Sequence, residues 1–271
     1  MEILVDRNMP AVEYHSIAGA SASRLKALRR SPMHLRHMDE EPIKGSALEF
    51  GEAFHTAILE PMRFENDYAF MPDGIDRRTK EGKATYQTML DTFVGKKVMS
   101  YDDGLALTGM ASAVQANSTA TDLLQGRTET EISLVWSELD IKCKARIDAY
   151  NLEQRCIVDL KTTQDASPSE FARSVAAFGY HIQAAWYMRA MRRAKFDVET
   201  MVFIAVEKTA PYGVACYTLD SEAIAEGERE VARLLPILSN CIHTNNWHGY
   251  DEMIQTLRLP RWAIRGEEAT L

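Results

Sequence analysis

The chain carries two short apolar stretches, Ile141-Lys-Cys-Lys-Ala-Arg-Ile-Asp-Ala-Tyr150 and Arg155-Cys-Ile-Val-Asp-Leu-Lys-Thr162. Each has the length and the β-branched content of a strand. Between them lies the polar tetrad Asn151-Leu-Glu-Gln154, which suits a tight turn. Two strand-like stretches joined by so short a polar connection predict a β-hairpin.

Three charged residues of this hairpin are candidates for chemistry: Asp148, Asp159 and Lys161. Side chains alternate along a strand, so Asp159 and Lys161 share one face while Leu160 points to the other. The hairpin can bring Asp148 close to both. Carboxylate oxygens suit Mg²⁺, and a nearby lysine can orient or activate a water. The alternative is an ordinary surface Asp–Lys pair, which the Asp-x-Lys pattern alone favours.

Length and composition indicate a soluble protein with a sizeable core. The 271 residues suffice for one large domain or two small ones, and 46% of them are hydrophobic. No apolar run approaches the roughly 18 residues of a transmembrane helix, and the N-terminus lacks the pattern of a signal peptide. The cysteines at 143, 156, 216 and 241 are scattered without a C-x-x-C motif. We therefore expect reduced, buried thiols, no structural zinc and a cytoplasmic protein of a bacterial or phage-infected cell.

The formal net charge of −8 argues against tight non-specific binding to DNA. Basic residues nevertheless concentrate in 24–37 and 189–195, and acidic ones in 220–230. A chain that is acidic overall can still line one channel with positive charge.

An N-terminal helix carries the first candidates for DNA contact. Ser23 is a candidate N-cap for a helix before Pro32, which can end that helix or start the next one over 33–38. Lys26, Arg29 and Arg30 on this helix are candidates for phosphate contacts, although a solvated helix face explains them equally well. Arg146, on the first strand of the hairpin, is a further candidate.

Residues 45–60 predict a helix stopped by Pro61. Gly51 and His55 lie four residues apart and so share a face. A glycine inside a helix usually marks the close approach of another backbone. A single histidine on such a helix is more often a hydrogen-bonded core residue than a ligand. We expect a loop over 61–80 and helices over 80–94 and 103–120.

From residue 128 onward the pattern predicts β-β-β-α-α-β-β and then a long helix over 220–245. A mixed sheet flanked by helices is the natural packing, which makes the fold class α/β (α+β) with an N-terminal helical region. Glu131, at the start of the first strand, is placed to face Asp148 and Asp159, or to be a solvent-facing edge residue. In the helix that begins at Gly179, Gln183 and Tyr187 lie on one face. An amide there requires a polar partner.

This ordered set of residues resembles the PD-(D/E)xK nuclease superfamily. It resembles most closely the RecE-like (exonuclease VIII) phage and prophage exonucleases of its RecB and lambda-exonuclease type. The segments that carry the resemblance are Ser23-Arg-Leu-Lys, Phe50-Gly-Glu-Ala-Phe-His55, Lys144-Ala-Arg-Ile-Asp148, Val158-Asp-Leu-Lys-Thr-Thr163 and Gly179-Tyr-His-Ile-Gln-Ala-Ala-Trp-Tyr187. The resemblance implies one nuclease domain over 1–271, with a mainly helical part at 20–125 and a catalytic core at 126–265.

The resemblance also implies roles for single residues. Asp148 and Asp159 would ligate Mg²⁺, for which Mn²⁺ can substitute, with help from the Leu160 backbone carbonyl. His55 would be a further ligand or a neighbour of one, and Glu131 would match an acidic position on the preceding strand. The remaining implied catalytic residues are Lys161, which would position or deprotonate the attacking water, and Gln183 and Tyr187, which would hold the scissile region or the lysine.

RecE-like relatives are processive 5′→3′ exonucleases on double-stranded DNA ends. They form closed trimeric or tetrameric rings and leave a 3′ single strand for an annealing protein of the RecT or Bet type. The resemblance implies the same activity, partners and assembly here, in DNA recombination and away from membranes. One alternative is a Cas4- or RecB-like nuclease that acts on single-stranded DNA, and another is an endonuclease. A non-catalytic DNA-binding protein is a third, which the intact Asp148, Asp159 and Lys161 argue against.

Overall fold

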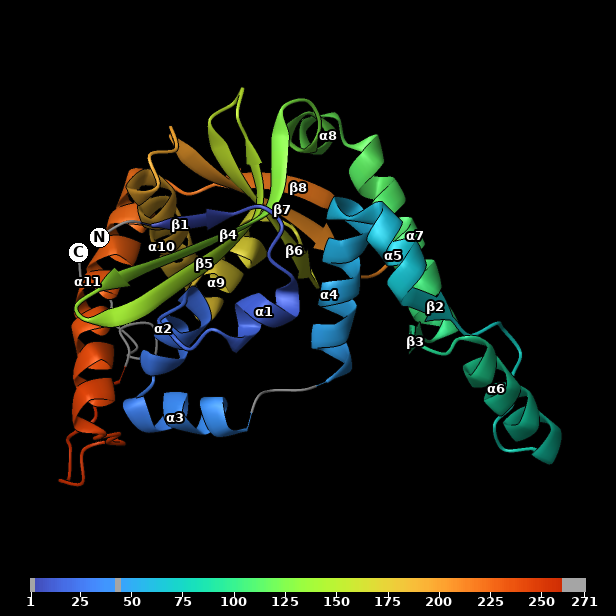
Figure 1. Ribbon diagram of the computed structural model, residues 1–271, viewed down its shortest axis with the longest axis horizontal. Coiled ribbons are helices and arrows are strands. Elements are labelled where there is room, and N and C mark those ends of the chain that lie inside the picture. Colours follow the sequence, from blue (N-terminus) through green and yellow to red (C-terminus); the bar gives the residue numbers. More distant parts are fainter. Residues whose placement is uncertain (1–2, 42–44, 260–271) are drawn as a thin grey trace, which may run out of the picture.

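The computed structural model describes residues 3–41 and 45–259. Within these residues the centre is one six-stranded sheet with helices on both faces (Figure 1). The strands lie in the order β1-β4-β5-β6-β7-β8 across the sheet. They are β1 (Leu4–Asp6), β4 (Thr128–Glu138), β5 (Ile141–Asn151), β6 (Cys156–Thr163), β7 (Thr200–Glu207) and β8 (Val214–Thr218). The predicted fold class, a mixed sheet flanked by helices, is confirmed.

The predicted hairpin is formed by β5 and β6, and β4, β5 and β6 are consecutive antiparallel strands. Every neighbouring pair of the sheet is antiparallel except β6 and β7, which run parallel. Parallel strands need a crossover connection, because the chain must return to the same end of the sheet. Here α9 (Pro168–Phe178) and α10 (Tyr180–Arg193) make that crossover. This topology brings α10 against the face of the sheet that carries Asp159.

The sheet separates two hydrophobic cores. The first core lies between the sheet and α2 (Ala22–Leu28), α9, α10 and α11 (Ser221–Thr244). The second core lies between the other face and α4 (Ser46–Leu59), α7 (Tyr101–Ala116) and α8 (Ser118–Leu124). Helices α1 (Ala11–Ser16) and α3 (Pro32–Glu40) lie beside the first core (Figure 1). Among the described residues, no helix combines the length and the apolar character needed to cross a bilayer.

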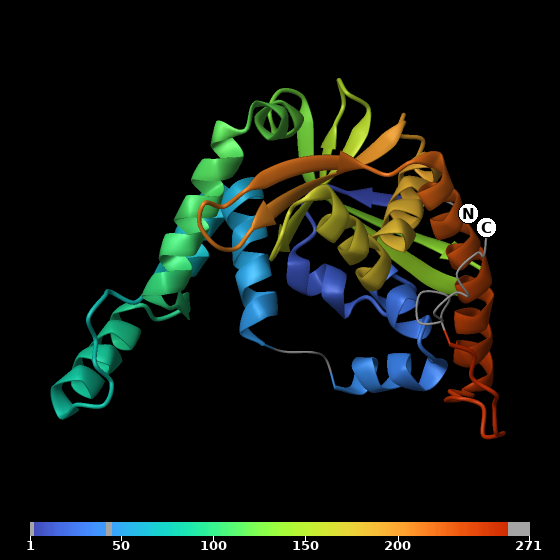
Figure 2. The same cartoon turned by 180° about the vertical axis from the view of Figure 1, so that it is seen from behind.

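An arm that contains α6 (Lys80–Thr92) projects away from the sheet (Figures 1 and 2). It is attached through a small sheet of two parallel strands, β2 (Tyr68–Phe70) and β3 (Lys97–Met99). No residue of α6 is buried. The predicted helix over 80–94 is therefore present, but it contributes to neither core.

Segment 61–80 is not the continuous loop that we predicted. It begins with α5 (Pro61–Asp67), which leads directly into β2. Pro61 ends α4 as expected, but it also occupies the first turn of the next helix. Proline suits that position because its fixed φ is already helical and its missing N–H has no partner to lose.

Two further helix boundaries differ from prediction. Helix α2 begins at Ala22, because the Ser21 hydroxyl accepts a hydrogen bond from the Arg24 N–H at 3.3 Å. Ser21 has the extended backbone that a cap requires, whereas Ser23 is already helical. The predicted helix over 103–120 is divided at Asn117, whose side chain caps α8.

All four cysteines are free thiols, as predicted. Cys143, Cys156 and Cys241 are buried, but Cys216 on β8 is only half-buried. Strand β8 is an edge strand, so its side chains are covered on fewer sides than those of β5 and β6.

Glu138 connects the end of β4 to α10. Its carboxylate lies 3.0 Å from Arg193, contacts Arg189 and accepts a hydrogen bond from the Trp136 indole at 3.2 Å. Burial alone would raise the pKa of Glu138, but these contacts outweigh burial and lower the pKa below its usual range. The charged carboxylate therefore stabilises the packing of α10 on the sheet.

Replacing Glu138 with glutamine should lower the free energy of unfolding by about 1 kcal/mol at neutral pH. The value is small because the two guanidinium groups are 40% and 43% exposed, so solvent screens them. Since the folded-state pKa is depressed, the contribution exists above the unfolded-state pKa and is lost as the pH falls through the folded-state value. Urea unfolding of both proteins at pH 7 and pH 3 measures this. An equal loss at both pH values would contradict the ionic contact.

Candidate active site

Asp148 and Asp159 lie where β5 and β6 separate. The antiparallel ladder of the two strands ends, on this side, at the pair Ala149 and Val158. Beyond that pair, the Leu160 N–H donates to Oδ2 of Asp148 at 3.0 Å. A side-chain carboxylate thus takes the place of a backbone acceptor, and the two strands open into a fork.

The fork also directs the Leu160 carbonyl. Within a strand, the N–H and C=O of one residue point to the same edge. Because the Leu160 N–H points toward β5, its carbonyl does so as well. This orientation is the one that the predicted role of the carbonyl as a metal ligand requires.

The strands are irregular beside Asp148. Ile147 belongs to the first core and Ala149 to the second, although residues two apart on a strand normally share a face. Glu131 lies across from Asp148 on β4, and the pairing of β4 with β5 skips both residues. Glu131 has a φ of +57°, which is uncommon for a residue other than glycine. Such breaks in a ladder redirect side chains and are frequent at functional sites.

Asp148 is paired with His55 of α4. The His55 Nδ1 lies 3.2 Å from Oδ2 of Asp148. Burial alone would lower the pKa of His55, but the Asp148 carboxylate outweighs it and raises the pKa. Burial would likewise raise the pKa of Asp148, but His55 and then Lys161 lower it. Both shifts favour the charged pair, which attaches α4 to the fork.

Asp159 is 1% exposed and is held from two sides. Its Oδ1 accepts a hydrogen bond from Nε2 of Gln183 at 2.6 Å, and its Oδ2 contacts the Lys161 ammonium. Burial alone would lower the pKa of Lys161, but Asp159 and then Asp148 outweigh it and raise the pKa. Lys161 is therefore a protonated donor in this arrangement.

The structure thus brings together residues that the sequence places on four separate elements. His55 comes from α4, Asp148 from β5, Asp159 and Lys161 from β6, and Gln183 from α10. The helices before and after the hairpin both converge on its carboxylates. The chemical roles assigned to these side chains stay predictions.

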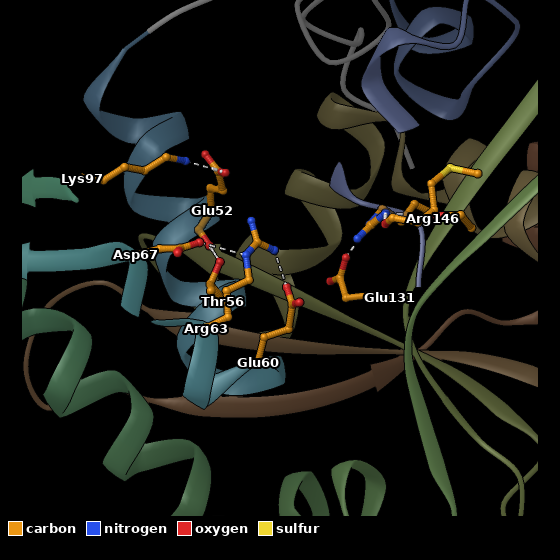
Figure 3. A network of polar contacts seen from close by, with 10 residues as sticks. Glu52, Thr56, Glu60, Arg63, Asp67, Lys97, Glu131 and Arg146 are labelled. Carbon is orange, nitrogen blue, oxygen red and sulfur yellow. Dashed lines mark hydrogen bonds and ion pairs between the residues drawn. The ribbon is translucent and has the colours of Figure 1, made fainter. Parts of the chain in front are cut away.

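A cleft of about 570 Å³ opens beside these residues and is lined by His55, Asp148 and Lys161. Glu131 lines the same cleft, as the sequence suggested, and its carboxylate contacts the Arg146 guanidinium (Figure 3). Burial and then the Asp148 charge raise the pKa of Glu131 above its usual value.

The opposite wall of the cleft is formed by α4 and α5. Arg63 of α5 lies 2.7 Å from Glu60, at the junction of the two helices, and 3.0 Å from Asp67 in its own helix (Figure 3). These ion pairs hold the wall that faces Glu131.

A second cavity, of about 600 Å³, lies on the other side of Asp148. Asp148 and Arg146 line both cavities, so the carboxylate can be approached from two directions. Tyr187 lines this second cavity beside Asp148 and Lys144. Tyr187 therefore borders the second cavity, whereas Lys161 borders the cleft.

The four predicted DNA contacts all bond to protein atoms. Lys26 donates to Gln183, and Arg146 donates to a backbone carbonyl, to a serine hydroxyl and to Glu131. Arg29 donates to two carbonyls at the C-terminal end of α9, and Arg30 to a tyrosine hydroxyl of the C-terminal segment. Of the four, Lys26 is linked to Asp159 through Gln183, and Arg146 contacts Glu131 beside Asp148.

The donor set fits a hard divalent cation by its chemistry. Asp148, Asp159, Glu131 and the Leu160 carbonyl offer oxygen atoms, which Mg²⁺ prefers. In the described part of the chain, no three His, Cys, Asp or Glu side chains are already grouped as a complete metal site. His55 contacts one carboxylate and Lys161 the other, so a bound cation would compete with these two contacts.

Comparison with known proteins agrees with this geometry. Residues 21–260 match the model of a family described as a PDDEXK-like domain of unknown function (DUF3799). This chain belongs to that family. The match covers both the helical N-terminal part and the sheet, and it includes every predicted site residue of this PDDEXK-like domain. The superfamily predicted from the sequence is confirmed, whereas the RecE-like branch stays a prediction. PD-(D/E)xK nucleases typically use divalent metal ions.

The chain was also compared with solved structures, and the first match below has a similar fold. A proposed exonuclease from Eubacterium rectale matches with a TM-score of 0.63 and 14% identity, over 93% of this chain and 96% of the other. A phage-related exonuclease from Haemophilus somnus 129PT matches with a TM-score of 0.35 and 13% identity, over 72% of this chain and 95% of the other. No curated protein matches the sequence. The likeness to the Eubacterium rectale structure, with its TM-score of 0.63, concerns the fold alone and agrees with the family match.

Two residues at the site carried no predicted role. The Tyr180 ring centroid lies 5.0 Å from the Lys161 ammonium. Tyr180 precedes Gln183 by three residues, and this helical spacing was a usable signal. Lys144 donates to the Tyr14 carbonyl at 2.8 Å within the second cavity. Lys144 precedes Asp148 by four residues on β5, and even spacing along a strand predicts that two side chains share a face.

Gly51 does not mark the close approach of another backbone, contrary to the prediction. A Cβ atom at this position would meet no atom of the described chain within 4 Å. Gly51 instead lines the cleft, on the same helix face as His55. The glycine therefore borders open space.

The change Gly51→Ala should raise the free energy of unfolding by about 0.5–1 kcal/mol, because alanine is the better helix former and nothing obstructs its methyl group. Gly227→Ala on α11 is the matched control. A Cβ there would lie 2.2 Å from the His181 carbonyl oxygen, so this variant should be destabilised. Chemical denaturation of both variants measures the difference. Destabilisation by Gly51→Ala would show that the cleft is closed at α4.

Proposed function

We propose that this protein is a nuclease that hydrolyses DNA phosphodiester bonds with a divalent metal ion. The observation that carries the proposal is the fork between β5 and β6, where Asp148, Asp159 and Lys161 meet beside an open cleft. Two carboxylates with a lysine are a sufficient basis for metal-dependent phosphodiester hydrolysis. The nuclease fold of the family supports the same activity.

In this proposal Asp148 and Asp159 hold Mg²⁺ or Mn²⁺ together with the Leu160 carbonyl. Glu131 stands beside them as a further metal ligand, and His55 becomes one only once its imidazole has lost its proton. When bound, the ion supplies a water of lowered pKa and offsets charge on the phosphate. Gln183 fixes one oxygen of Asp159, and the second oxygen contacts Lys161, which lines the cleft.

Lys161 acts as a donor in this proposal. The Asp159 and Asp148 carboxylates raise the pKa of Lys161, so before a cation binds its ammonium is a donor that can orient a water beside them. A protonated ammonium has no lone pair with which to accept a proton. In the metal-free site this favours positioning of the water, the first of the two roles that the resemblance implies. Tyr187 contributes from the second cavity, beside Asp148.

The finer proposal is a RecE-like exonuclease that degrades double-stranded DNA from its ends in the 5′→3′ direction. The five sequence segments that resemble this group support it. The cavities on either side of Asp148 suit a strand that crosses the carboxylates. A ring of three or four subunits, a RecT- or Bet-type annealing partner and a cytoplasmic role in recombination belong to the same proposal.

The change Asp159→Asn should reduce the release of nucleotides from an end-labelled linear duplex by at least about a hundredfold in Mg²⁺, because it removes a metal-binding charge. Asp140→Asn, in the exposed turn between β4 and β5, is the matched control and should keep full activity. EDTA should abolish the activity of the wild type, and Mn²⁺ should restore it. Full activity of Asp159→Asn would refute the site, and an inactive wild type in both metals would refute the nuclease.

A covalently closed circular duplex should resist the enzyme, because an exonuclease needs an end. The same DNA linearised once should be degraded, with label released first from the 5′ end. Gel analysis of both forms in Mg²⁺ makes the comparison. Cutting of the circle would favour an endonuclease, and a preference for single-stranded DNA would favour the Cas4- or RecB-like alternative.

A further inference from the structure

Lys26 is partly buried beside the carboxylates and belongs to a chain of polar contacts. Its ammonium donates to Oε1 of Gln183 at 3.3 Å. Nε2 of the same Gln183 donates to Oδ1 of Asp159 at 2.6 Å. The chain links α2 through α10 to β6, from the N-terminal part of the protein to its central sheet.

The two ends of the Gln183 carboxamide are chemically different. Its oxygen only accepts hydrogen bonds and its NH₂ group only donates them. The Asp159 carboxylate can only accept, and the Lys26 ammonium can only donate. Lys26 and Asp159 therefore favour the same orientation of the amide, and Lys26 holds its oxygen while the NH₂ group faces Asp159. In the reverse orientation, an amide oxygen would face the carboxylate and an amide donor would face the ammonium.

The segment from Gly179 to Gln183 is shaped around the lysine side chain. A Cβ atom at Gly179, which has a φ of +64°, would lie only 3.2 Å from Cγ of Lys26. The Tyr180 ring centroid lies 5.6 Å from the Lys26 ammonium and 5.0 Å from that of Lys161. The glycine makes room for the lysine stem, the tyrosine ring faces its charge, and Gln183 accepts its hydrogen bond.

The position of Lys26 is electrostatically unfavourable. Burial, and then repulsion by Lys161, lower the pKa of Lys26 to about 8, while the Asp159 charge opposes this. A lysine that served only to contact DNA phosphate would remain in solvent, where neither effect is strong. The unfavourable location indicates that the contact with Gln183 matters to the site.

We propose that Lys26 is a positioning residue that orients Asp159 through the Gln183 carboxamide. This inference rests on the proposed nuclease function, and it replaces the predicted phosphate contact of Lys26. Because Lys26 acts on the orientation of Asp159, it should change the rate of the chemical step and the affinity for the metal. It should leave the affinity for DNA unchanged.

A double-mutant cycle tests the proposal with Lys26→Met, Gln183→Met and both together. Lys26→Met keeps the length of the side chain and removes the charge, and Lys26→Gln serves if that variant does not fold. We expect kcat on linear duplex to fall about tenfold in Lys26→Met, the scale of one hydrogen bond to a charged group, with the KM for DNA nearly unchanged. The double variant should be no slower than Gln183→Met alone, because Lys26 acts only through Gln183. Lys83→Met, on the exposed arm, is the matched control and should equal the wild type.

Other outcomes would overturn the proposal. An unchanged kcat in Lys26→Met would show that the contact with Gln183 has no function. A raised KM, a shallower dependence of DNA binding on salt and losses that multiply in the double variant would identify Lys26 as a phosphate contact.

Calorimetric titration with Mn²⁺ alone, without DNA, separates this inference from the proposed function. Lys26→Met and Gln183→Met should weaken Mn²⁺ binding to the same extent, and the double variant no further. Wild type that binds Mn²⁺ but cuts no DNA would refute the nuclease and leave this readout intact. Mn²⁺ binding that is unaffected by Lys26→Met, in an active nuclease, would refute the positioning role alone.

Discussion

The hydrogen bond from the Leu160 N–H to the Asp148 carboxylate is the contact on which the site depends. It satisfies a buried backbone donor without extending the ladder of β5 and β6, and so lets the two strands part. A backbone acceptor in its place would continue the sheet and close the fork. The opening leaves Leu160 and the Asp148 carboxylate at the cleft, with Asp159 buried next to them. One substituted hydrogen bond thus turns a regular hairpin into a site with converging oxygen atoms.

Opening the fork places two negative charges where little solvent reaches them, and buried charges need partners. His55 supplies one positive charge from α4 and Lys161 the other from β6. Gln183 adds a neutral donor from α10. The same contacts fasten α4 and α10 to opposite faces of the sheet. Stability and the proposed chemistry therefore depend on the same side chains, and any cation that binds Asp148 or Asp159 must replace part of what holds them.

Much of this arrangement can be predicted from local pattern. Strand alternation places Asp159 and Lys161 on one face, and helical spacing places Gly51 with His55. Both periodicities are properties of the backbone and need no knowledge of neighbours. Predictions that depended on neighbours were less successful. Gly51 borders open space, and segment 61–80 begins with a helix because proline can start one helix as well as end another.

The sequence by itself determined the order of elements from residue 128, the superfamily, and the identity of the carboxylates and the lysine. These follow from periodicity and from short motifs, which are local. The tertiary structure alone decided what surrounds them: that Asp148 bonds to the Leu160 N–H, that two cavities meet at its side chain, and that Lys26 turns inward to Gln183. Residues 26 and 183 are far apart along the chain. Only the crossover that packs α10 against both α2 and the sheet brings them into contact. No local sequence pattern predicts a contact between residues so far apart in the chain.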